Sequence, residues 1–153
     1  MSIPTILAVL SKGTEAITRL SAWNNRTQGK GALLVEELRD NLVHLDMVAK
    51  GETQLANVID LLSDTQYKML LGEKFFFNSL KNQKIADYPS LYGTDLASWT
   101  NKTTEELIKS IYRKISDLRL RYKNAGESAK YQWGRRVQSI RKRVWLLLKH
   151  IEA

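Results

Sequence analysis

Residues 103–124 read TTEELIKSIYRKISDLRLRYKN, and residues 133–151 read WGRRVQSIRKRVWLLLKHI. In both stretches apolar residues recur every three or four positions, which is the repeat of one helix face. The apolar positions are Ile108, Ile111, Ile115, Leu118 and Tyr122, then Trp133, Val137, Ile140, Val144, Leu147 and Ile151. Thr103 with Glu106 three positions later is typical of a capping box at a helix start. Residues 124–126 end the first helix and the second begins near Ser128, so we expect two antiparallel helices joined by a short turn.

The same helical rhythm continues upstream of residue 103. We expect helices over about 2–23, 32–50 and 52–62, followed by a short helix that ends at Gly72. Ser63, with Gln66 three positions later, predicts a second capping box at the start of this short helix.

Residues 73–101, which we call the aromatic segment, interrupt the helical spacing. They hold six of the thirteen aromatic residues together with Pro89 and Gly93. We expect one or two short helical turns here, packed across one end of the bundle. Phe75, Phe76 and Phe77 could stack on bases of single-stranded nucleic acid, but three consecutive phenylalanines are more typical of a core. The predicted fold is an all-α antiparallel bundle of four long helices plus one or two short helices, in one domain over residues 1–153.

Composition limits the classes of protein that remain. The chain is 43 % hydrophobic and 26 % charged, which indicates a folded, soluble protein. It contains no cysteine, so disulfides, thiolate metal sites and cysteine nucleophiles are excluded. The apolar stretch from Met1 to Leu10 is too short for a membrane span and predicts a core helix. We therefore expect a cytoplasmic protein that does not partner a membrane.

The charge is concentrated in the last third of the chain. Residues 102–153 carry fourteen Lys/Arg and five Asp/Glu, whereas residues 1–101 carry ten and eleven, so the last third accounts for the formal net charge of +8. No acidic residue occurs between Lys130 and Lys149. We expect an outward-facing cationic surface on the last helix, although such a surface could also serve only as a solvated face. Its members are Arg135, Arg136, Arg141, Lys142, Arg143 and Lys149.

A surface of this kind attracts phosphates or carboxylates without reading a sequence. The predicted function is therefore a non-enzymatic interaction module that binds an anionic partner, RNA or DNA first and an acidic protein surface second.

The end of the last helix is apolar on every side, from Val144 to Leu148. Trp145 and Leu146 project from opposite sides of the apolar stripe, so we expect them to contact another molecule or another copy of the chain. Alternatively, the aromatic segment could cover them. These residues make a self-associating structural subunit a further possible function.

Two histidines follow arginines at short spacing. Four residues separate Arg39 from His44, and six separate Arg143 from His150. This pattern resembles the Arg-x(4–6)-His motif of HEPN-type helical ribonucleases. The resemblance implies a dimeric helical bundle that cleaves RNA without a metal, in which His moves the 2′-hydroxyl proton and Arg stabilises the phosphorane charge. The candidate catalytic residues are then these four; the alternative is two surface histidines.

Glu37, Asp40 and His44 fall on one side of the predicted second helix, at the spacing of a possible metal site. A metal-binding helical bundle also needs Glu and Glu-x-x-His ligands from other helices, and this chain has no Glu-x-x-His. We therefore expect no metal site and no cofactor, and an Asp40–His44 pair on a wet helix face instead.

Overall fold

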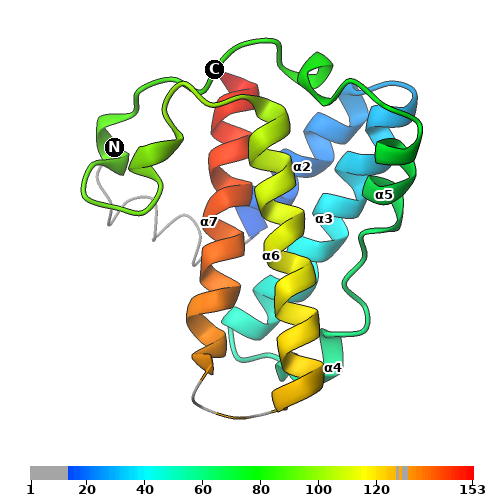
Figure 1. Ribbon diagram of the computed structural model, residues 1–153, viewed down its shortest axis with the longest axis vertical. Helices are drawn as coiled ribbons and strands as arrows, with labels where there is room; N and C mark the ends of the chain where they lie inside the picture. The colour runs from blue at the N-terminus through cyan, green and yellow to red at the C-terminus, as the bar shows by residue number, and fades with distance from the viewer. Residues whose placement is uncertain (1–13, 127, 129–130) are drawn as a thin grey trace.

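The computed structural model describes residues 14–126, 128 and 131–153, and every regular element in these ranges is helical (Figure 1). The elements are α2 (Thr14–Arg26), α3 (Lys30–Ala49), α4 (Leu55–Val58), α5 (Thr65–Gly72), the 3-10 turns η1 (Phe77–Leu80), η2 (Pro89–Leu91) and η3 (Ala97–Trp99), α6 (Thr104–Ala125) and α7 (Trp133–Glu152). The prediction of an all-α bundle is confirmed. None of these described helices combines the length and the apolar character that a membrane crossing requires.

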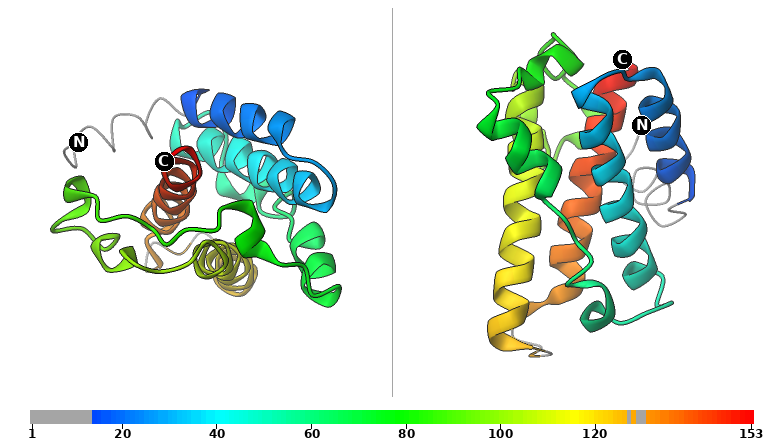
Figure 2. Two further views of the ribbon diagram at one scale, coloured as in Figure 1. Left: turned by 90° about the horizontal axis from the view of Figure 1, so that it is seen from above. Right: turned by 90° about the vertical axis from the view of Figure 1, so that its right-hand side faces the viewer.

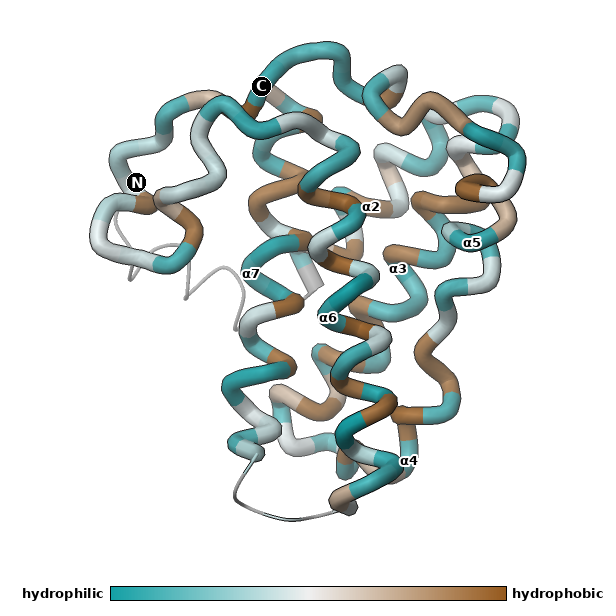
Figure 3. The backbone as a smooth tube through the Cα atoms, in the orientation of Figure 1, coloured by the Kyte–Doolittle hydropathy of each residue, from teal (hydrophilic) through white to brown (hydrophobic). Residues whose placement is uncertain are grey.

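Four long helices form the bundle. Helices α6 and α7 lie side by side and antiparallel, α3 packs against α7, and α2 packs against α3 and α7 (Figures 1 and 2). The apolar stripes predicted for the last two helices face inward: Ile108, Ile111 and Ile140 are at most 1 % exposed. Figure 3 shows this alternation as brown and teal segments along α6 and α7.

The predicted capping box of α6 is confirmed. The Thr103 hydroxyl accepts a hydrogen bond from the Glu106 N–H at 3.2 Å, and the Glu106 carboxylate accepts one from the Thr103 N–H at 2.8 Å. Two N–H groups at this helix terminus, which have no partner within the helix, are thereby satisfied.

The predicted capping box of α5 is wrong, because its start is satisfied by another helix. Glu37 of α3 accepts hydrogen bonds from the N–H groups of Gln66, at 2.8 Å, and Tyr67, at 3.2 Å, and from the Ser63 hydroxyl at 2.8 Å. Asn41, one turn further along α3, pairs with both backbone groups of Ser63 at 2.8 Å. Two α3 side chains therefore fix the path of the chain into α5.

Two other predicted boundaries differ. The helix predicted over 52–62 is shorter and covers only Leu55–Val58 as α4. The helix predicted over 2–23 continues to Arg26, and its part before Thr14 lies outside the described residues.

Trp145 and Leu146 are 2 % and 0 % exposed, so the prediction that they contact another molecule is wrong. Helix α7 is flanked by α6, α3 and α2, and the aromatic segment lies beside its end (Figure 2). A helix with neighbours on several sides must be apolar around most of its circumference. The apolar end of α7 is therefore explained within one molecule.

The aromatic segment crosses one end of the bundle, as predicted, with three 3-10 turns (Figure 1). Phe77 is buried and meets Phe75 edge-on at 5.2 Å, whereas Phe76 is 60 % exposed, so core packing is confirmed for two of the three phenylalanines. Residues 86–100 form a lobe whose neck is closed by two backbone hydrogen bonds. The Ile85 N–H donates to the Lys102 carbonyl at 2.9 Å, and the Asn101 N–H donates to the Ile85 carbonyl at 2.8 Å.

Candidate functional site

Helices α6 and α7 account for the charge of the whole protein. Together they carry twelve Lys/Arg and four Asp/Glu, while the remainder of the chain carries twelve of each. Any site for an anion is therefore expected on these two helices. What decides its location is which cations face outward and which are paired within the molecule.

Arg141 does not face outward. Its Nε atom donates to Asp46 Oδ1 of α3 at 2.5 Å, its Nη1 atom donates to Gln138 at 2.7 Å, and both charged side chains are 4 % exposed. Burial raises the pKa of Asp46, and the charge of Arg141 acts in the opposite direction. The prediction of Arg141 as a surface contact is wrong because its side of α7 faces α3.

Lys142 and Arg143 share one carboxylate, Asp95, which comes from the lobe. Lys142 Nζ lies 3.0 Å from Oδ1, and Arg143 Nη2 lies 3.3 Å from Oδ2. Burial raises the pKa of Asp95, but the hydrogen bonds and charges of Lys142 and Arg143 outweigh it, and the pKa falls below its ordinary value. Arg143 is itself buried and also bonds Ser139, so its predicted outward orientation is wrong.

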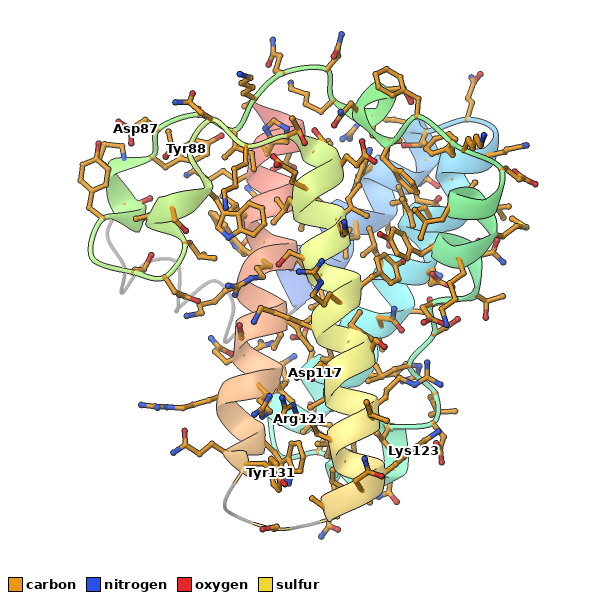
Figure 4. The ribbon with its side chains drawn as sticks, viewed as in Figure 1. Asp87, Tyr88, Asp117, Arg121, Lys123 and Tyr131 are labelled. Atoms are coloured by element: carbon orange, nitrogen blue, oxygen red, sulfur yellow. The ribbon has the colours of Figure 1, made fainter. Side chains whose placement is uncertain are left out.

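Asp117 of α6 is shared in the same way. Arg136 Nη1 of α7 lies 3.1 Å from Oδ2, and Arg121 Nε lies 2.9 Å from both carboxylate oxygens. Figure 4 shows Asp117 and Arg121 on the side of α6 that faces α7. This carboxylate therefore joins α6 to α7 through Arg136, and it also binds Arg121 one turn further along its own helix.

The two remaining predicted cations have no carboxylate partner among the described residues. Arg135 is exposed in the first turn of α7 and donates to the Gln132 side chain at 3.1 Å. The Lys149 ammonium lies 5.0 Å from the ring centroid of Tyr88 and 5.2 Å from that of Trp145, which are cation–π distances. Only Arg135 is fully available at the surface.

These contacts define a cationic seam between α6 and α7. We use "the α6–α7 seam" for Lys114, Asp117 and Arg121 of α6, Arg135, Arg136, Ser139, Lys142 and Arg143 of α7, and Asp95. Each carboxylate pairs with two cations, and no ion pair joins Lys114 or Arg135 to a described carboxylate. The seam therefore holds six cations and two carboxylates, which leaves a surplus of four positive charges.

Lys114 lies at the centre of the seam, although it was not among the cations predicted from the sequence. No ion pair joins Lys114 to a described carboxylate, and with Asp117, Arg135, Arg136 and Ser139 it lines a depression of about 160 Å³. Burial, followed by repulsion from Arg143, lowers the pKa of Lys114 below its ordinary value, although the charges of Asp95 and Asp117 act in the opposite direction. A lysine whose charge is opposed by neighbouring cations gains from a bound anion. Its position on the flank of the Ile111–Ile115–Leu118 stripe was the signal that it borders α7.

The Arg/His pairs do not form a catalytic arrangement within the described molecule. His150 is 1 % exposed, and its Nε2 atom lies 2.8 Å from the Thr104 hydroxyl. Because that hydroxyl donates its proton to the Lys81 carbonyl at 2.7 Å, His150 Nε2 carries a hydrogen and donates to Thr104. A histidine held in this way cannot reach a 2′-hydroxyl. Arg143, its predicted partner, is occupied by Asp95 and Ser139.

The pair on α3 is also separated by local contacts. Arg39 Nη2 donates to Asp40 Oδ1 at 3.0 Å, and His44 lines a groove that Arg39 does not line. Glu37, the first residue of the predicted metal stripe, is occupied by the start of α5. Among the described residues no cluster of His, Asp and Glu is arranged to hold a metal ion.

No family model matches this chain, and no curated protein or solved structure matches it either.

Proposed function

We propose that the protein binds the phosphate backbone of RNA or DNA at the α6–α7 seam. The observation that carries this proposal is the sharing of Asp95 and Asp117, each between two cations, which leaves the seam with four uncompensated positive charges. If each cation had its own carboxylate partner, the seam would have no surplus charge with which to bind an anion. Because each carboxylate is shared, the ion pairs orient the guanidinium groups and leave part of their charge unneutralised.

The length of the seam suits several phosphates. On α7 the seam extends from Arg135 to Arg143. Over these residues the helix rises about 12 Å, at about 1.5 Å per residue. Phosphates on one strand of a duplex repeat about every 3.4 Å along its axis, so roughly three fall within this length.

No aromatic side chain with an exposed ring lines the depression at the centre of the seam. The proposed binding therefore depends on phosphate charge, without base stacking or reading of base edges. A cytoplasmic, nucleic-acid-binding module is the corresponding cellular role.

The test is a binding measurement with a fluorescently labelled RNA oligonucleotide, single-stranded and duplex, from about 50 to about 200 mM salt. We expect Lys114→Glu/Arg135→Glu to weaken binding at least about tenfold at low salt and to flatten the salt dependence, because contacts to phosphates are lost. Lys68→Glu/Lys84→Glu changes the net charge equally on other surfaces and should retain most of the affinity.

Two outcomes would overturn the proposal. The first is an equal loss in both double variants, which would mean that net charge alone drives the association. The second is binding of polyglutamate without binding of either oligonucleotide, which would assign the seam to an acidic protein surface.

A further inference from the structure

A second surface feature lies on α3, away from the α6–α7 seam. It is a groove of about 490 Å³ between α3 and the chain that joins α4 to α5. The residues that shape its chemistry are Leu33, Glu36, Asp40, Val43, His44 and Leu61. Figure 2 shows α3 and α5 from this side of the molecule.

The groove has fixed walls. Glu37 and Asn41, on the α3 wall, hold Ser63 and the first turn of α5 through hydrogen bonds of 2.8–3.2 Å. Because both walls are tied together, a ligand would meet a preformed surface and would lose little free energy to ordering it.

The groove exposes apolar area along one face of α3. Leu33 is 41 % exposed and Leu61, on the opposite wall, is 57 % exposed. Leu33, Glu36, Asp40 and Val43 recur every three or four residues, and Met47, which is 36 % exposed, continues the row. An exposed helix face with apolar residues at this spacing is the kind of surface that receives an amphipathic helix.

The charge of the groove is negative. Glu36, Glu37 and Asp40 line it, and no Lys or Arg is among its described lining residues. Arg39 at its margin pairs with Asp40, so a formal charge of about −2 remains from these four residues. Nucleic acid would be repelled here, and a cationic ligand would be attracted.

We propose that this groove docks a basic amphipathic helix of a partner protein. Leucine-like side chains of that helix would cover Leu33, Val43 and Leu61, and its Lys or Arg side chains would face Glu36 and Asp40. From Leu33 to Met47 the row on α3 extends about 21 Å, which matches roughly four turns of a bound helix.

The test uses a labelled peptide of about four helical turns that contains only Leu and Lys, with Leu at helical spacing. We expect it to bind the full-length protein more tightly than a scrambled peptide of the same composition, and more tightly than the same pattern with Glu in place of Lys. Glu36→Lys/Asp40→Lys should weaken binding at least about tenfold, because attraction at two positions becomes repulsion. Leu61→Ser, a change at an exposed side chain, should weaken it severalfold without altering the fold.

Glu15→Lys/Glu52→Lys is the matched control, since it adds the same charge outside the groove. The proposal fails if the native protein does not distinguish the patterned peptide from the scrambled one, or if the control double variant loses as much affinity as Glu36→Lys/Asp40→Lys. A third outcome would also overturn the proposal. If the protein alone self-associates in sedimentation and Glu36→Lys/Asp40→Lys abolishes this association, the groove is assigned to a second copy of the chain.

Discussion

Asp46 and Arg141 are the most deeply buried ion pair among the described residues. Removing one partner of such a pair leaves the other charge buried without compensation, whereas replacing both by apolar residues can be nearly neutral. We expect Arg141→Met to lower the free energy of unfolding by about 3–5 kcal/mol, as measured by urea denaturation. Arg141→Met/Asp46→Leu should recover most of this loss. A double variant no more stable than the single one would contradict this account.

His150 makes the stability of the protein depend on pH. Burial and the nearby charge of Lys81 lower the pKa of His150 below its ordinary value of 6.5. The unfolded chain therefore takes up a proton that the folded chain resists, so stability is retained above about pH 6.5 and is lost as the pH falls below it. The slope contributed by this one group is at most about 1.4 kcal/mol per pH unit.

We expect denaturation series between pH 7.5 and 5.5 to show this loss in the native protein and a smaller one in His150→Gln, whose amide can still donate to Thr104. His44→Gln serves as the control and should retain the full loss, because it leaves His150 in place. Identical slopes in all three proteins would refute the assignment to His150.

At the scale of elements, the start of α5 depends on α3. Glu37 accepts hydrogen bonds from two N–H groups and one hydroxyl there, and its negative charge lies at a helix N-terminus, where it is stabilising. We expect Glu37→Ala to lower the free energy of unfolding by about 2 kcal/mol and to accelerate hydrogen exchange at the amides of Gln66 and Tyr67. Glu36→Ala, at the exposed neighbouring position, should leave both unchanged.

The spacing of residues along the chain predicted where the helices lie better than it predicted which elements contact one another. The repeat of three and four positions located α6 and α7, and the Thr103–Glu106 pattern located a helix start, because both depend on contacts within one helix. The cap of α5 was predicted wrongly because Glu37 reaches it from a distant part of the sequence. Local patterns contain no information on such partners.

The orientation of the α7 cations was mispredicted for a related reason. A single apolar stripe assumes one neighbour, but α7 packs against three helices, so Arg141 and Arg143 beside the stripe are also buried. Their partners Asp46 and Asp95 lie 95 and 48 residues away along the chain. Net charge therefore identified the two helices that carry the excess of cations, and only the folded structure identified which of these cations are exposed.

At the scale of the whole molecule, the α6–α7 seam combines cohesion between two helices with a surplus of charge. Asp117 contributes to the first and reduces the second. We expect Asp117→Asn to tighten binding of the RNA oligonucleotide severalfold at low salt and to steepen its salt dependence, because Arg121 and Arg136 are released toward the ligand. The loss of stability should stay near about 1 kcal/mol, since these ion pairs are partly exposed.

Asp40→Asn is the control for this variant, since it removes the same charge from α3. It should change oligonucleotide affinity much less than Asp117→Asn. Unchanged or weaker affinity in Asp117→Asn would show that phosphate does not occupy the α6–α7 seam.

The closed neck of the lobe over residues 86–100 gives this protein a place to vary during evolution. The two backbone hydrogen bonds that join Ile85 to Asn101 and Lys102 do not involve the lobe's own side chains, and Gly93, with its positive φ of 81°, lies within the lobe. Descendants could lengthen or shorten the chain beside Gly93 without moving the bundle. The same lobe supplies Asp95, the carboxylate that pairs with Lys142 and Arg143. Substitutions in the lobe can therefore change the positive charge of the surface while the helical bundle stays unchanged.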